Sequence, residues 1–351
     1  KEALMASIDN KENLARMGRA SRKNYDEMAG MEAYRRSMKQ LYSLSDIKNT
    51  EDLKKRTERN REIFSERTQK EYFQNQSADS LTTKDGIAVV SMTSHPGRIA
   101  LAEKCIRTLI EQTVMPKKLL LWLSIEEFPN KSMDLPKGLI VLKNICDFFD
   151  IRWVEGDLKP HKKYFYAMQE YKDDPIIIVD DDVYYDSHLV ENLLESYERF
   201  PDCVSAMRTN LIGFRRDGSI MDYEGWTMGY RVLQDTPSTQ LIPTGVGGVL
   251  YPPGALPAEA FDVDAINENC LFCDDLWLKI WTCHAGLKTV MPAHFCTENL
   301  IEDSQDVALW KMNVRHGNNN DMSLKKILEH YEKKTGKTGE LLRWIRKDRF
   351  C

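Results

Sequence analysis

The stretch Ile176–Asp182, with the sequence IIIVDDD, decides the fold class of this chain. Four β-branched residues in a row are typical of a short strand buried on both faces, as in a parallel sheet covered by helices. Three carboxylates follow at its carboxyl end, the place where ligands bind in such sheets. Their mutual repulsion would be offset by a divalent cation that takes its other ligands from phosphates. We therefore expect a metal and diphosphate site here, and the alternative is a solvated acidic turn.

Strands and helices alternate around this stretch. Short apolar runs predict further strands at 87–93, 119–124 and 151–154. Apolar spacing predicts helices over 98–113, 161–172, 187–200 and about 274–284. This alternation indicates an α/β fold with a mixed, mainly parallel sheet flanked by helices.

Three segments differ in composition. Residues 1–84 contain no proline, are rich in Glu, Lys, Arg, Met and Ala, and are predicted to form a helical N-terminal extension. The polar stretch 77–86 is a linker, and residues 85–322 form the predicted catalytic domain. Residues 323–351 form a basic helical tail with nine Lys and Arg side chains.

Composition excludes several classes of protein. The chain has 351 residues, 42% hydrophobic and 29% charged, which is the profile of a soluble globular protein. No uninterrupted apolar stretch reaches the length that spans a membrane. The net charge of −5 argues against nucleic-acid binding as the main function. The eight cysteines are spread too thinly for a disulfide scaffold, so we expect reduced thiols in a cytoplasmic enzyme.

A second acidic motif, CDDLW at Cys273–Trp277, lies about ninety residues after the first. Asp274 suits the first turn of a helix, where the macrodipole favours negative charge. Asp275 could act as a general base or position an acceptor. Helix capping alone is the alternative explanation of this pair.

The order of the motifs resembles that of the GT-A class of nucleotide-sugar glycosyltransferases. A strand and loop ending at Arg98, a second strand, a DLKPHKK segment at 157–163, the DDD, a Gly-Gly pair and the late DD follow one another. The likeness covers residues 86 to about 320 and is greatest to family-2-like bacterial capsule and cell-surface polysaccharide enzymes. The DDD and the late CDD also resemble exostosin-like transferases. The resemblance implies a Rossmann-like GT-A domain.

The resemblance also implies roles for residues of the donor site. Asp182 would ligate Mn²⁺ or Mg²⁺, and Asp180 would contact the ribose or sugar and share in the metal site. Alternation along an extended segment would place Asp180 and Asp182 on one side and Asp181 on the other. The residues expected to bind the nucleotide sugar are Thr93, Ser94, Arg98, Asp157, Lys159, Lys163, Asp180, Asp181, Gly247 and Gly248.

On the acceptor side, the resemblance implies that Asp275, with Asp274 beside it, is the catalytic carboxylate. Trp226, next to a glycine in a predicted loop, is a candidate for stacking on an acceptor sugar. A late histidine completes the metal site in many members of the class, and His316 is the first candidate, ahead of His294.

The sequence thus predicts a metal-dependent glycosyltransferase that moves a sugar from a nucleoside-diphosphate donor, with UDP expected, to a hydroxyl of a surface glycan or lipid-linked glycan. Whether it inverts or retains the anomeric configuration stays open. The alternatives are a nucleotidyl- or phosphotransferase with the same DDD metal site, or a non-catalytic glycan-binding or scaffold protein. The N-terminal helices are candidates for homo-oligomer contacts. The basic tail is a candidate for contact with the inner face of the cell membrane, although a helix docked on the body is the favoured interpretation.

Overall fold

The computed structural model describes residues 86–296, 299–301 and 319–348. The chain divides into two units, Lys1–Leu53 and Lys54–Cys351, and every described residue belongs to the second. The predicted helical extension and its boundary near residue 84 lie outside the described residues.

The described residues form helices and strands with the following bounds. The helices are α4 (Ile99–Ile110), α5 (Lys137–Ile145), α6 (Lys162–Glu170), α7 (Leu189–Arg199), α8 (Val263–Asn269), α9 (Asp274–His284), α11 (Asn319–Thr335) and α12 (Thr338–Ile345). The strands are β1 (Val89–Thr93), β2 (Lys118–Ser124), β3 (Phe149–Val154), β4 (Ile176–Ile178), β5 (Val183–Tyr184), β6 (Cys203–Ala206), β7 (Thr209–Leu211), β8 (Leu241–Pro243), β9 (Val249–Tyr251), β10 (Lys288–Val290) and β11 (Asn299–Leu300).

A seven-stranded sheet forms the centre of the described part, in the order β10-β6-β9-β4-β1-β2-β3. β1 pairs in parallel with both β2 and β4, and β2 pairs in parallel with β3. β9 runs antiparallel between β4 and β6, and β10 is parallel to β6. The predicted α/β class, with a mixed and mainly parallel sheet, is therefore confirmed. Two small antiparallel pairs, β5 with β11 and β7 with β8, lie beside the main sheet.

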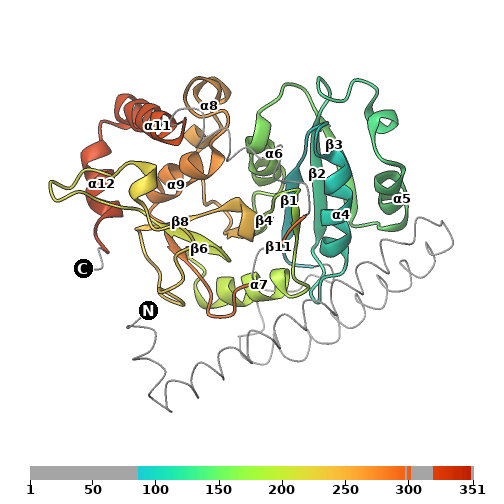
Figure 1. The fold of residues 1–351 in the computed structure, drawn as a ribbon, viewed down its shortest axis with the longest axis horizontal. Helices are drawn as coiled ribbons and strands as arrows, with labels where there is room; N and C mark the ends of the chain where they lie inside the picture. Colours follow the sequence, from blue (N-terminus) through green and yellow to red (C-terminus); the bar gives the residue numbers. More distant parts are fainter. Residues whose placement is uncertain (1–85, 297–298, 302–318, 349–351) are drawn as a thin grey trace, which may run out of the picture. The chain divides into compact units, whose positions relative to one another are not determined.

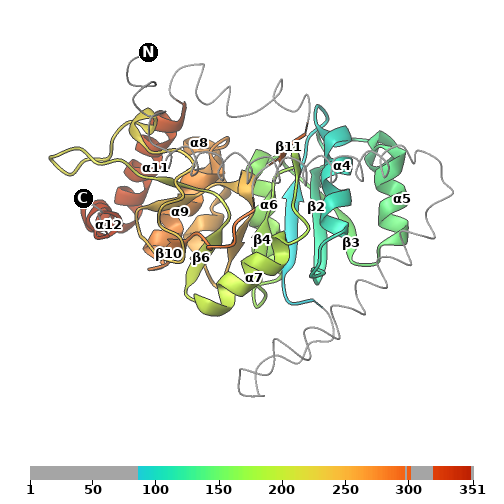
Figure 2. The ribbon, with the colours of Figure 1, turned by 60° about the horizontal axis from the view of Figure 1, so that its bottom comes forward.

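The side chains of β1, β2, β4 and β9 alternate between two hydrophobic cores, one on each face of the sheet. Val89 packs with α6, α8 and α9 on one face, whereas Val90 packs with α4, α5 and α7 on the other. Ile176 and Ile178 face the first core, and Ile177 faces the second. Both cores need apolar residues at every position of a strand, which explains why β4 reads as an unbroken apolar run. Figures 1 and 2 show α6 and α4 on opposite sides of β1.

The tail docks on the body of the domain. Leu341 and Ile345 of α12 are buried, and Tyr331 of α11 packs on α9, where its hydroxyl lies 2.8 Å from His284 Nδ1. Thr239 Oγ1 donates to the Ile345 carbonyl, which fixes the end of α12 beside the sheet. The structure thus agrees with the favoured interpretation of the tail as a docked helix.

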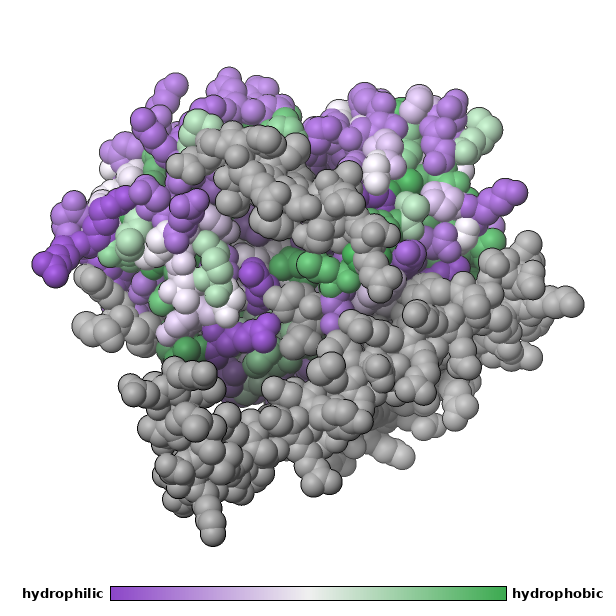
Figure 3. Space-filling model, in the orientation of Figure 1, coloured by the Kyte–Doolittle hydropathy of each residue, from purple (hydrophilic) through white to green (hydrophobic). Residues whose placement is uncertain are grey.

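Hydrophilic side chains cover much of the described surface on the face seen in Figure 3, with smaller apolar areas between them. None of the described helices is both long and apolar enough to cross a bilayer. The seven cysteines in the described ranges are free thiols, and all but Cys296 are buried.

Candidate active site

The DDD turn, Asp180–Asp182, lies at the carboxyl edge of the central sheet. β4 ends at Ile178, and its parallel neighbour β1 ends at Thr93, so the loops after both strands open on the same edge. The loop after β1 carries Ser94 and Arg98 toward the turn. α6 and α9 also begin near this edge, so segments far apart in the sequence converge around the three carboxylates.

The first half of the site is a pairing of Arg98 with two carboxylates. Arg98 Nε lies 3.2 Å from Asp181 Oδ1, and Nη2 forms an ion pair with Asp182 Oδ2. Ser94 Oγ donates a 2.6 Å hydrogen bond to Asp181 Oδ2. Arg98, Asp181 and Asp182 are each less than 10% exposed. Ser94 and Arg98 therefore belong to the acidic cluster, and their expected role in binding the nucleotide sugar stays a prediction. Thr93 lies outside this cluster and donates from Oγ1 to the Trp122 carbonyl.

The second half of the site is built around Lys163, in the first turn of α6. Its Nζ lies 2.7 Å from Asp180 Oδ1 and 2.9 Å from Asp274 Oδ2. Burial opposes a charge on Lys163, but the Asp180 and Asp274 carboxylates outweigh burial and hold its pKa well above the usual range. A Cβ added at Gly245 would lie only 2.7 Å from Lys163 Nζ and 3.0 Å from Asp180 Oδ1, so a larger residue here would displace this ion pair. Lys163 thus joins the two acidic motifs from inside the protein, and its expected contact with the nucleotide sugar stays a prediction.

Asp275 lies beside Lys163 and its partners. Its Oδ1 accepts a 3.1 Å hydrogen bond from the Gly245 backbone N–H. Burial raises the pKa of Asp275 to about 8, and the neighbouring charge of Asp274 adds to the rise while Lys163 opposes it. A partly buried carboxyl group whose pKa lies close to neutral pH can exchange a proton in the physiological range, and it accepts one in its ionised form.

Side chains hold the backbone of Asp180 in place after the strand has ended. Cys105 Sγ donates to the Asp180 carbonyl over 3.2 Å. The Asp180 N–H donates to the Tyr185 hydroxyl over 2.9 Å, and that hydroxyl donates to the Val246 carbonyl over 3.2 Å. Tyr185 therefore links the DDD turn to the glycine-rich turn at 245–247.

The three carboxylates do not alternate as we expected. Asp181 and Asp182 share Arg98, whereas Asp180 points to Lys163. The prediction is wrong because β4 ends at Ile178, so the carboxylates lie in a turn and the two-residue period of a strand does not apply to them.

The site carries an excess of negative charge. Five carboxylates, those of Asp180–Asp182, Asp274 and Asp275, stand against the paired cations Arg98 and Lys163. Burial raises the pKa of Asp182 to about 7, and Asp180 and Asp181 add to the rise although Arg98 opposes it. Burial is the main cause of this rise, and the repulsion from Asp180 and Asp181 shows that Arg98 alone does not offset the neighbouring carboxylates.

The chemistry of these oxygens fits a hard divalent cation. In the ranges that the structure describes, no three His, Cys, Asp or Glu side chains converge to hold an ion by themselves. Such a site matches a cation that binds one or two carboxylates and takes its remaining ligands from phosphates. His294 is exposed, and the preferred histidine candidate, His316, lies outside the described residues.

Asp157 and Lys159 belong to a neighbouring charged cluster after β2 and β3. Lys162 Nζ lies 3.0 Å from Glu127 Oε2 and also pairs with Asp157. Lys159 Nζ lies 3.2 Å from Glu127 Oε1 and pairs with Asp157 too. Lys159 has a positive φ of 49°, a conformation that Asp157 supports by accepting a hydrogen bond from the Lys159 N–H.

This cluster predicts a pH-dependent contribution to stability. Burial would raise the pKa of Asp157, but hydrogen bonds from Lys159 and Lys162 outweigh it and hold the pKa well below the usual range. Because the folded pKa is depressed, the contribution is present above the unfolded value of about 4 and is lost as the pH falls through the folded value. Asp157→Asn should lower the free energy of unfolding by about 1–2 kcal/mol at pH 7, and less below about pH 4.

Urea unfolding of wild type and variant at pH 7, 4 and 3 measures this difference. The exposed Asp173→Asn is the matched control and should have little effect at any pH. A cost for Asp157→Asn that stays constant across this range would contradict the assignment.

Three other predicted site residues are used for packing. A Cβ at Gly247 would lie 2.6 Å from Arg208 Cβ, and one at Gly248, where φ is +88°, would lie 2.8 Å from Leu189 Cδ1. These glycines are therefore required by close approach within the protein. Trp226 is only 5% exposed and donates from Nε1 to the Met221 carbonyl, so the expectation of an open stacking face is wrong.

Sequence reasoning missed two residues of the site. Gly245 was visible only as part of a GVGG stretch, but it is the glycine that faces Lys163 and Asp275. His95 lies near both charged clusters. Burial lowers its pKa below the ordinary value. The Asp181 and Glu127 carboxylates oppose this change, and the cations Arg98 and Lys162 add to it. The SHPGR loop after the first predicted strand was the signal that could have identified His95.

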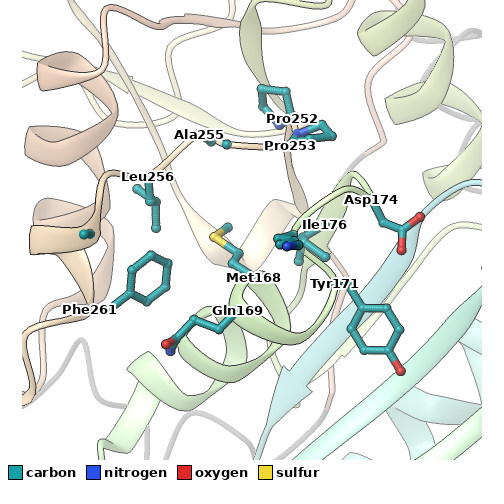
Figure 4. A pocket seen from close by; sticks show the side chains of 13 residues that line it. Met168, Gln169, Tyr171, Asp174, Ile176, Pro252, Pro253, Ala255, Leu256 and Phe261 are labelled. Carbon is teal, nitrogen blue, oxygen red and sulfur yellow. The ribbon is translucent and has the colours of Figure 1, made fainter.

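A cavity of about 370 Å³ lies elsewhere, at the amino end of β4 (Figure 4). Met168 from α6, Ile176 and the Pro252-Pro253 turn line it together with Phe261. Because Ile176 is the first residue of β4 and the DDD turn follows its last, the cavity is separate from the acidic site.

No protein-family model matches the sequence, and no curated protein matches it significantly. Among solved structures, the chain is similar to a mannosyltransferase from Pyrobaculum calidifontis in complex with GDP-Man and Mn²⁺, with 13% identity over 84% of this chain and 89% of the other and a TM-score of 0.42. It is also similar to a 4-diphosphocytidyl-2C-methyl-D-erythritol synthase, with 11% identity over 65% and 97% and a TM-score of 0.35. A UDP-glucose pyrophosphorylase complexed with UDP-glucose follows, with 10% identity over 71% and 99% and a TM-score of 0.34. Likeness at this level does not extend to ligand or reaction.

Proposed function

We propose that the chain is a metal-dependent glycosyltransferase that moves a sugar from a nucleoside diphosphate, with UDP expected, to a hydroxyl of a glycan acceptor. One observation carries the proposal: Lys163 and Gly245 join the DDD turn and the Asp274-Asp275 pair into a single acidic site at the carboxyl edge of the sheet. In open α/β sheets this edge is where ligands bind.

Asp180 and Asp182 are the side chains that would hold Mn²⁺ or Mg²⁺ in this proposal. When bound, the ion would stabilise negative charge on the departing diphosphate as a Lewis acid. The unbalanced charge of the site and the raised pKa of Asp182 support such a role for these carboxylates.

Asp275 is the proposed catalytic carboxylate. In an inverting transfer, the acceptor oxygen forms a bond to C1 of the sugar as the bond from C1 to the diphosphate oxygen breaks, and the hydroxyl proton passes to Asp275. The hydrogen bond from the Gly245 N–H orients the carboxylate, and Lys163 keeps Asp274 paired beside it. In a retaining transfer, the same carboxylate would steady positive charge on the sugar.

The decisive experiment measures UDP binding by calorimetry with and without Mn²⁺, for wild type and Asp182→Asn. Binding of UDP to the wild type should depend on Mn²⁺, and the variant should lose about a hundredfold in affinity because asparagine is a neutral and weaker ligand. The exposed Asp202→Asn is the control and should bind as the wild type does.

Two outcomes would overturn the proposed function, and a third would overturn the metal site assigned to Asp182. Wild type that binds no UDP in the presence of Mn²⁺ would favour a non-catalytic glycan-binding or scaffold protein. Release of pyrophosphate from a nucleoside triphosphate, with no sugar transfer, would favour a nucleotidyltransferase. Unchanged binding by Asp182→Asn would place the metal elsewhere.

A further inference from the structure

Arg98 is held between two carboxylates in an unusual way. Its Nε faces Asp181 and its Nη2 faces Asp182, so the guanidinium does not form the parallel two-bond pair with one carboxylate that is the strong geometry for arginine. Both nitrogens are buried, and neither makes a hydrogen bond of good geometry within the described residues. Charge attraction therefore accounts for the pairing.

Asp182, one of the two carboxylates that Arg98 pairs with, is also proposed to bind the metal ion. A dication on Asp182 would stand within a few ångströms of a guanidinium, and like charges at such distances repel even in a high dielectric. A diphosphate brings the negative charge that both cations need, and arginine binds phosphate readily.

We propose that Arg98 competes with the divalent cation for Asp182 and thereby makes metal binding depend on the nucleoside diphosphate. This inference rests on the proposed function. The free protein binds the metal ion weakly because the Arg98 guanidinium occupies Asp182 and repels a second cation there. The diphosphate accepts the guanidinium, frees Asp182, and so raises the affinity for the ion.

The change of partner requires only the side chain of Arg98 to turn. Its backbone stays fixed at the start of α4, where its N–H donates to the His95 carbonyl and its carbonyl accepts from the N–H groups of Leu101 and Ala102. Ser94 remains on Asp181 through its 2.6 Å hydrogen bond, so one polar contact to that carboxylate persists when the guanidinium leaves.

The test is Arg98→Gln, which removes the charge and keeps a polar side chain. Free Mn²⁺ is measured by electron paramagnetic resonance during titration with Mn²⁺ alone and with Mn²⁺ in saturating UDP. We expect the variant to bind Mn²⁺ alone about tenfold more tightly than wild type. The factor by which UDP strengthens Mn²⁺ binding should fall by at least about tenfold.

Two variants serve as controls. Arg98→Lys keeps the charge and should retain the weak Mn²⁺ binding of the wild type. Arg107→Gln removes an arginine of the following helix, α4, that pairs with Glu103 over 2.7 Å, and it should behave as wild type. Arg98→Ala is a second neutral variant with the same expectation as Arg98→Gln, so a folding defect in one leaves the other as the test.

The outcomes separate this inference from the proposed function. If Mn²⁺ and UDP bind together to the wild type, but the neutral variants bind Mn²⁺ alone no more tightly, the competition is refuted and the proposed function stands. If the wild type binds no Mn²⁺ even with UDP, the proposed metal site is refuted, and the inference fails with it.

Discussion

Replacing Asp275 by asparagine is expected to slow sugar transfer about a thousandfold while Mn²⁺-dependent binding of UDP stays close to that of wild type. The amide oxygen can still accept the hydrogen bond that the Gly245 N–H gives to Oδ1, so the local structure should persist. An amide cannot take the proton of the acceptor hydroxyl. The change therefore removes proton transfer and leaves the donor site intact.

Steady-state rates of UDP release with acceptor present, combined with calorimetry for UDP, measure the two effects separately. Asp264→Asn is the matched control, because Asp264 is an exposed aspartate in the first turn of another helix, α8. Transfer by Asp275→Asn at a rate near that of wild type would show that the catalytic carboxylate lies elsewhere. A parallel loss of UDP binding would place Asp275 in the donor site.

Replacing Lys163 by methionine is expected to lower the free energy of unfolding by about 3–5 kcal/mol, because it leaves the buried Asp274 without its cation. Lys163 Nζ is the atom that joins Asp180 to Asp274, and its side chain is only 4% exposed. Methionine has a similar length and fills the space, so the loss reports charge and not a cavity.

Urea unfolding measures this effect. The exposed Lys172→Met, just beyond the end of α6, is the control and should change stability by less than about 0.5 kcal/mol. The double variant Lys163→Met with Asp274→Asn should recover about 1–3 kcal/mol, because it removes the unpaired charge. A double variant that shows the full sum of the two single losses would argue against the pairing.

The sequence pattern predicted the first half of the sheet well. Apolar runs at 87–93, 119–124, 151–154 and 176–179 correspond to β1–β4, and the predicted helix at 274–284 coincides with α9. Continuous apolar runs and helical spacing were the signals that identified these elements. β9 and β10 have three residues each, as β4 does, but neither lies in a run of four β-branched residues, and both went unpredicted.

The sequence predicted the acidic residues of the candidate site but not the contacts that join them. The motifs IIIVDDD and CDD marked Asp180–Asp182, Asp274 and Asp275, and the structure brings these together through Lys163. Nothing in the local sequence marks Gly245, because the atom that a side chain there would meet, Lys163 Nζ, belongs to a residue about eighty positions earlier in the chain. Trp226 resembled an exposed aromatic residue by its loop context, but tertiary packing buries it.

The residues by themselves determined that this chain forms a mainly parallel sheet and that carboxylates gather where its central strand ends. Both follow from local order along the chain: the run of apolar side chains and the acids directly after it. The partner of each carboxylate was decided by the tertiary structure alone. Charges act through space, so the partner of a carboxylate can come from a distant part of the sequence. Lys163 pairs with Asp180, and Arg98 pairs with Asp182. The turn after β4 sets the direction in which each of these carboxylates points.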